Sequence, residues 1–150
     1  MQHLCVIIHQ FKRYKHGNKN FVNLPVKDLD KSISFFTNLG FSFNPQFTDE
    51  KAGCMVISDS IFAMLLTESY FKTFTRKEVS DAKKATEVLI ALDTNSKEEV
   101  QQIVAKAKKS GATIYSEPQY HGWMYQHSFA DLDGHQWEFV YMDQTQLPNQ

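Results

Sequence analysis

The chain has 150 residues, of which 42% are hydrophobic and 22% are charged, as is typical of one folded domain with its own core. Its 16 basic and 17 acidic residues nearly cancel, so charge gives no support for nucleic acid binding, which usually needs a basic face. No apolar run approaches the roughly 20 residues of a membrane span, and Cys5 and Cys54 form no pairing pattern. We therefore expect a cytoplasmic protein without a membrane segment.

The two ends of the chain differ from the rest. Residues 1–20 contain three histidines among several basic residues and close near the turn-prone pair Gly17-Asn18. They could form a basic arm for an anionic partner, but we expect a poorly ordered extension that the fold does not need. Residues 144–150 are expected to form a C-terminal tail.

Residues 21–67 predict a first unit of one strand, one helix and three strands. Asp28 can cap a helix whose apolar residues recur at helical spacing, and Gly40 stands where a left-handed C-terminal residue is expected. The predicted strands cover residues 21–26, 41–47, 54–57 and 61–67.

A polar connector follows at residues 68–86. Its first part contains Tyr70, Phe71 and Phe74, and its second part is rich in charged residues. A connector of this length inside a compact domain often folds over something or carries function.

Residues 87–143 repeat the order of the first unit. Ser96 and Glu99 have the spacing of a capping box, and Gly111 ends the predicted helix. Strands are predicted at 87–93, 113–116, 124–130 and 136–142, with Asp133-Gly134 as the turn between the last two. The repeat indicates an α+β fold of paired βαβββ modules, whose curved mixed sheet surrounds a shared cavity and carries its helices outside.

Two motifs give this pattern a family likeness. The first is LPVKDLDKSISFF at residues 24–36 with LGF at 39–41, and the second is DLDGHQWE at 131–138. Together they resemble the vicinal oxygen chelate superfamily, the glyoxalase/bleomycin-resistance/extradiol dioxygenase proteins, over roughly residues 21–143. The resemblance supports the fold strongly and any particular activity only weakly.

The resemblance implies a divalent metal, such as Zn, Ni, Mn or Fe. Four side chains would hold it, one from the first strand and one from the last strand of each module. These positions fall on Phe21, about Leu65, about Leu89 and Glu138, and only Glu138 can bind a metal. We therefore expect the usual metal site to be absent.

Other residues could rebuild a site. His121 and His127 lie beside the penultimate predicted strand and could join Glu138 in a metal site of two histidines and one carboxylate. Without a metal, Glu138 in the cavity would be a candidate catalytic general base. His135 lies in the predicted turn and is expected to be exposed to solvent.

Aromatic and polar residues near these positions are predicted ligand contacts. Asn23 shares the strand face of Phe21, and Trp123 and Tyr125 can stack on a flat ligand beside His127. Aromatic packing at the edge of the domain is an equal alternative for the segment that contains Trp123 and Tyr125.

Two functions of the cavity remain open from the sequence, besides a structural or partner-binding role through the basic arm at residues 1–20. One is an enzyme acting on a small oxygen-bearing substrate, a metal-assisted lyase, isomerase or dioxygenase with a nonstandard site. The other is a metal-free protein that binds or sequesters a drug or metabolite. Open strand edges favour a homodimer in either case.

Overall fold

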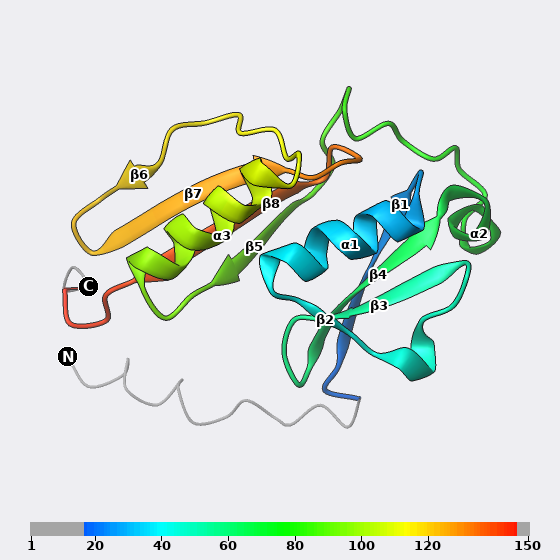
Figure 1. Cartoon of the computed structure of the whole chain (residues 1–150), viewed down its shortest axis with the longest axis horizontal. Coiled ribbons are helices and arrows are strands. Elements are labelled where there is room, and N and C mark those ends of the chain that lie inside the picture. The colour runs from blue at the N-terminus through cyan, green and yellow to red at the C-terminus, as the bar shows by residue number, and fades with distance from the viewer. Residues whose placement is uncertain (1–16, 147–150) are drawn as a thin grey trace, which may run out of the picture.

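The computed structural model describes residues 17–146 and contains the predicted repeat of two βαβββ modules (Figure 1). The first module consists of β1 (Asn20–Val26), α1 (Leu29–Leu39), β2 (Ser42–Phe43), β3 (Ala52–Val56) and β4 (Ile61–Thr67). The connector begins with a short helix, α2 (Glu68–Phe71), and a 3-10 turn, η3 (Lys72–Phe74). The second module consists of β5 (Leu89–Asp93), α3 (Lys97–Lys109), β6 (Gln119–Tyr120), β7 (Met124–Ala130) and β8 (Gln136–Met142).

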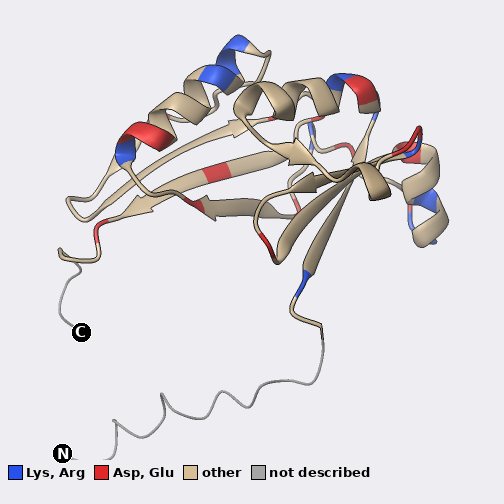
Figure 2. Ribbon diagram, turned by 60° about the horizontal axis from the view of Figure 1, so that its bottom comes forward, with Lys and Arg blue, Asp and Glu red and all other residues tan. Residues whose placement is uncertain are grey.

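Each module forms its own four-stranded mixed sheet. The strand orders are β1-β4-β3-β2 and β5-β8-β7-β6, and in each sheet the first strand runs parallel to the last one while the other pairs are antiparallel. The two long helices, α1 and α3, cover the same side of both sheets, and no long helix of the described residues covers the opposite side (Figure 2). We call this opposite side the open face.

Local capping fixes where α1 begins and ends. The side chain of Asp28 accepts a hydrogen bond from the backbone N–H of Lys31, and Gly40 has a left-handed φ of 107°. The buried residues of α1 share one face, which makes the helix amphipathic.

The helix α3 begins in a similar way. Ser96 accepts a hydrogen bond from the N–H of Glu99 at 3.1 Å. The Glu99 carboxylate accepts in return from the N–H of Asn95 at 2.8 Å, one residue before the capping position. The predicted cap is therefore present, with its return bond displaced by one residue.

The core joins the two modules. Phe35 and Phe36 on α1 make edge contacts with Phe129 and Trp137 of the second sheet, at centroid distances of 6.1 and 5.0 Å. Trp137 and Phe129 are completely buried. Because one helix of the first module packs on the sheet of the second, the modules share one apolar core.

Two predicted strands are shorter than expected. Residues 41–47 form only the two-residue β2, because Pro45 lacks an N–H for the ladder and begins a 3-10 turn, η2 (Pro45–Phe47). Residues 113–116 contribute a single bridge between Thr113 and Ala130, and the edge strand β6 forms later, beyond Pro118.

The ends of the chain lie largely outside the described residues. The predicted extension at residues 1–20 lies mostly outside the described residues, as does part of the tail, and Asn20 already belongs to β1. Within residues 17–146, no helix combines the length and the apolar character that crossing a membrane requires.

Candidate functional site

The open face carries Glu138, the residue that the sequence singled out. Glu138 is half-buried in β8, opposite Ser128 in β7 and beside Ala91 in β5. The Tyr115 phenol lies near both Ser128 and Glu138. Burial and the negative charge of Glu138 raise the pKa of Tyr115, and a hydrogen bond with Ser128 opposes this rise. These three groups form a polar cluster on the open face of the second sheet.

Strand register places His127 on the other side of the sheet. His127 is paired with Phe139, which is buried in the helix-covered core, so both side chains point toward α3 and away from Glu138. The ring Nε2 of His127 lies 3.2 Å from the Ser116 carbonyl oxygen. The structure therefore does not bring His127 and Glu138 together.

The other predicted contacts are also away from Glu138. Tyr125 belongs to the core and is 6% exposed, with the Lys97 ammonium 4.9 Å from its ring centroid. His121 is exposed in the turn before β7, and Trp123 is half-buried in the same turn. The turn is closed by a 2.9 Å hydrogen bond from the His121 N–H to the Met124 carbonyl oxygen.

The positions implied for a metal do not form a metal site. Phe21 and Leu89 lie on the open face, half exposed, whereas Leu65 is fully buried on the helix side of β4. Its neighbours on the open face, Met64 and Leu66, offer no nitrogen or oxygen ligand to a divalent ion such as Zn, Ni, Mn or Fe. In the described part of the chain, no three His, Cys, Asp or Glu residues are grouped so that they could hold a metal ion. The described residues at these positions therefore do not fit a metal.

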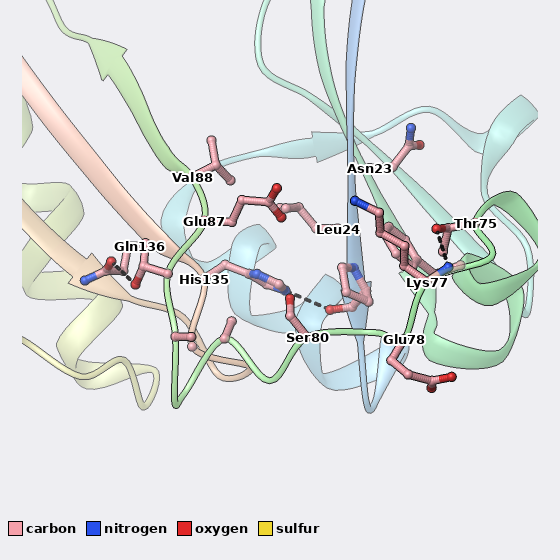
Figure 3. Close-up of a pocket in the computed structure, with 16 residues that line it drawn as sticks. Asn23, Leu24, Thr75, Lys77, Glu78, Ser80, Glu87, Val88, His135 and Gln136 are labelled. Atoms are coloured by element: carbon pink, nitrogen blue, oxygen red, sulfur yellow. Dashed lines mark hydrogen bonds between the residues drawn. The ribbon is translucent and has the colours of Figure 1, made fainter.

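A cavity lies where the two modules meet the connector (Figure 3). It has a volume of about 250 Å³ and is lined by β1, by the connector, by the residues before β5 and by the turn before β8. Asn23 is the predicted ligand contact that lines it. We call this space the inter-module cavity.

Two residues of the turn before β8, Asp133 and His135, form hydrogen bonds with the first module beside this cavity. The ring Nε2 of His135 lies 2.7 Å from the carbonyl oxygen of Pro25. Because a carbonyl can only accept, this nitrogen carries the proton. The carboxylate of Asp133 accepts from the N–H of Lys27 at 3.0 Å and from the hydroxyl of Ser32 at 3.3 Å. His135 is half-buried, so the expectation that it is solvent-exposed was wrong.

Asp131 holds the turn in this shape. One of its oxygens accepts from the backbone N–H groups of Asp133, Gly134 and His135, each at 3.0 Å, and the other accepts from the Trp137 indole at 3.0 Å. Burial raises the pKa of Asp131, while the charge of His135 and these donors act in the opposite direction. A buried carboxylate with four donors orders the turn that carries His135.

The charged side chains of the cavity come from the connector. Lys77 and Glu87 extend into it from opposite sides, with their charged ends toward one another (Figure 3). Glu78 also lines the cavity, but its carboxylate pairs with the Lys72 ammonium at 2.9 Å. The sequence analysis did not select Lys77 or Glu87, and the length and charge of the connector were the signals that pointed to this segment.

Two further cavities adjoin the first one. One, of about 290 Å³, lies over the open face of the first sheet and is lined by Asn23 and the aromatic residues Phe47, Tyr70 and Phe74. The other, of about 650 Å³, lies across residues 82–86 and includes Tyr115. Asn23 therefore borders both the inter-module cavity and the aromatic cavity.

Comparison with known proteins agrees with the architecture. The family model described as Glyoxalase/Bleomycin resistance protein/Dioxygenase superfamily matches residues 19–139. A hypothetical protein from S. aureus has a similar structure, with 31% sequence identity and a TM-score of 0.72 over 84% of this chain and 94% of that one. No curated protein matches this chain significantly.

More distant structures share the fold. The fosfomycin resistance protein FosX from Listeria monocytogenes, in complex with Mn(II) and sulfate, is 22% identical with a TM-score of 0.60, and the match covers 82% of this chain and 88% of that one. A bleomycin resistance determinant encoded on the transposon Tn5 is 18% identical with a TM-score of 0.58, and the match covers 83% of this chain and 98% of that one.

Proposed function

Since this chain belongs to the glyoxalase/bleomycin resistance protein/dioxygenase superfamily, we propose that it binds a small oxygen-bearing molecule in the inter-module cavity. The supporting observation is the lining of this cavity. Residues from both modules enclose it, and the Asn23 amide and the Lys77 ammonium can donate hydrogen bonds to ligand oxygens. A concave site at a module junction with a few polar groups among apolar ones is the usual form of a small-molecule site.

We propose further that binding needs no metal ion. Within residues 17–146, Glu138 belongs to no group of three His, Cys, Asp or Glu residues that could hold a metal, and His127 points to the other side of the sheet. The competing version is a metal-assisted lyase, isomerase or dioxygenase that uses Glu138, His121 and His127. Titration of the purified chain with Zn²⁺, Ni²⁺, Mn²⁺ and Fe²⁺ separates the two versions, because stoichiometric binding of any of these ions would contradict the metal-free one.

The location of the ligand can be tested with a matched pair of variants. A panel of small carboxylates, alcohols and ketones is screened by thermal shift in the presence of EDTA, and each hit is measured by calorimetry. Ala85 lines the inter-module cavity, so Ala85→Phe should fill part of it and weaken binding by about tenfold or more. Ala105 is exposed on α3, so Ala105→Phe should leave affinity unchanged. Equal affinities in the two variants would place the ligand elsewhere.

A metal-free enzyme is a second candidate, favoured by the cluster of Glu138, Ser128 and Tyr115 on the open face. The Tyr115 hydroxyl can donate a hydrogen bond to a ligand oxygen while the Glu138 carboxylate accepts a proton from the neighbouring carbon. A ligand deuterated beside its carbonyl should then exchange with water, as followed by NMR. Glu138→Gln should abolish the exchange, and Glu117→Gln, on the exposed loop, should not.

We also propose a homodimer. Phe21, Leu89 and Met142 lie on the open face with exposed fractions of 48%, 50% and 37%, and β1 and β5 are edge strands of their sheets. A second copy would cover this apolar surface. Light scattering coupled to size exclusion checks the expectation, and a monomer at micromolar concentration would contradict it.

A further inference from the structure

We propose that the ligand of the inter-module cavity is a zwitterion of the amino-acid type, whose carboxylate pairs with Lys77 and whose ammonium pairs with Glu87. This inference rests on the proposed function and names the class of ligand that the same cavity takes. It follows from which charged groups line the cavity and which of them already have partners.

Lys77 and Glu87 are opposite charges that face a common space without meeting. Lys77 lies in the middle of the long connector and Glu87 directly after its end, and their side chains point toward one another across the cavity (Figure 3). Among the ion pairs formed within residues 17–146, neither residue takes part. The two charged groups are thus available to a ligand that lies between them.

The other ionisable groups of the cavity are already engaged. Glu78 pairs with Lys72 at 2.9 Å, and Figure 3 shows its side chain directed away from Lys77 and Glu87. The protonated Nε2 of His135 donates to the Pro25 carbonyl oxygen at 2.7 Å. One positive and one negative group therefore remain to select the ligand.

A ligand with a single charge would satisfy only one of these groups. An anion at Lys77 would lie near the negative Glu87, and a cation at Glu87 would lie near the positive Lys77, so each meets one attraction and one repulsion. A molecule that carries both charges replaces the repulsion by a second attraction. Complementary charges at two fixed positions give specificity of this kind.

The remaining walls indicate the rest of the ligand. Leu24, Phe71 and Val88 line the cavity with apolar side chains, which favours an apolar group on the bound molecule. The volume of about 250 Å³ is below that of sites for drug-sized ligands, which begin at about 300 Å³. An amino acid with an apolar side chain, such as leucine, has the required charges and size.

The experiment measures binding to the full chain by calorimetry with L-leucine, L-valine and L-phenylalanine as probes. N-acetyl-L-leucine lacks the positive charge of leucine, and L-leucinamide lacks its negative charge. At least one of the three amino acids should bind, and for leucine each derivative should bind about tenfold more weakly or worse, the loss expected for one charge-assisted contact. Failure of all three amino acids to bind in the millimolar range would overturn the proposal.

Two matched pairs of variants assign the charges. Lys77→Gln should weaken leucine binding by about tenfold while Lys109→Gln on α3 leaves it unchanged, and Glu87→Gln should behave in the same way against Glu98→Gln. All four side chains are exposed, so folding is expected to be preserved. Leucine binding that is insensitive to Lys77→Gln or Glu87→Gln would overturn the proposal.

Failure of this inference is distinguishable from failure of the proposed function. If N-acetyl-L-leucine or another anion binds as well as leucine and Ala85→Phe weakens that binding, the cavity is a small-molecule site but not one for zwitterions. If no oxygen-bearing molecule of the wider screen binds in a way that Ala85→Phe weakens, both proposals fail.

Discussion

The ring of His135 donates a 2.7 Å hydrogen bond to the carbonyl oxygen of Pro25, across 110 positions of sequence. Pro25 lies in β1, the first strand of the first module, and His135 lies just before β8, the last strand of the second. This contact joins the two modules at the floor of the inter-module cavity. It also explains how a histidine in a tight turn becomes half-buried.

Removing this contact should lower stability. His135→Ala leaves the Pro25 carbonyl oxygen without its donor, and we expect the free energy of unfolding to fall by about 1–2 kcal/mol in urea denaturation. His135→Gln keeps a donor at this position and should lose less. His121→Ala, in an exposed turn, is the control and should stay within about 0.5 kcal/mol of the parent. Equal losses at the two histidines would contradict the role of the contact.

Asp131 should be the most sensitive polar residue of the same turn. Asp131→Ala leaves the N–H groups of Asp133 and His135 and the Trp137 indole without their acceptor, while the Gly134 N–H keeps its 3.1 Å bond to the backbone carbonyl oxygen of residue 131. We expect a loss of at least about 3 kcal/mol in the free energy of unfolding, since each orphaned buried donor costs about 1–3 kcal/mol. Asp59→Ala, at an exposed turn, should change stability little. A loss below 1 kcal/mol, on the order of one ordinary hydrogen bond, would show that water replaces the carboxylate.

Gly134 is needed for its backbone conformation and for the space that it leaves. Its φ is 100°, and a Cβ there would lie 2.7 Å from the backbone nitrogen of Lys83 in the connector. Gly40 has a similar φ of 107° but no neighbour within 4 Å of its Cβ position. Gly40→Ala should therefore cost about 1–2 kcal/mol for backbone strain alone, and Gly134→Ala should cost at least about 1 kcal/mol more for overpacking.

This comparison separates the two effects by thermal or urea unfolding. Equal losses at Gly40 and Gly134 would mean that the connector moves away from the turn without cost. In that case the connector is not firmly seated, and the inter-module cavity would be expected to change its shape.

The thiol of Cys54 should react slowly in the folded protein. It is 1% exposed in β3, and burial raises its pKa while the charge of Lys19 opposes the rise. A raised pKa means that less reactive thiolate is present at pH 8 than in a free cysteine. In a Cys5→Ser background, labelling with a thiol reagent should be slow in buffer and rapid in denaturant. Rapid labelling in buffer would contradict the buried position.

Much of the fold could be predicted because its determinants are local. Asp28, Gly40 and Ser96 mark helix ends through bonds to residues only a few positions away, and the observed helices begin and end beside them. The strands at residues 61–67, 124–130 and 136–142 were predicted with the observed bounds. The strand predicted at residues 41–47 was too long and β6 was missed, because edge strands depend on pairing as much as on their own residues.

The candidate site was predicted less completely. Asn23 lines the inter-module cavity and Glu138 lies on the open face, and their roles toward a ligand stay predictions. His127 was grouped with Glu138, but the pairing of the hairpin sets Ser128 opposite Glu138. A one-residue difference in register reverses the face of every side chain, and here the register follows from the turn that Asp131 organises.

The sequence by itself determined the two repeated modules, their helix caps and the Asp133-Gly134 turn, since these depend on neighbours along the chain. Only the tertiary structure decided that Lys77 and Glu87 face one cavity and that His135 fastens its floor to Pro25. The physical reason is that the contact between His135 and Pro25 joins separate modules, and that the cavity between Lys77 and Glu87 is lined by residues of both modules. Such residues meet only after α1 packs against the second sheet and the shared core of Phe36 and Trp137 has formed.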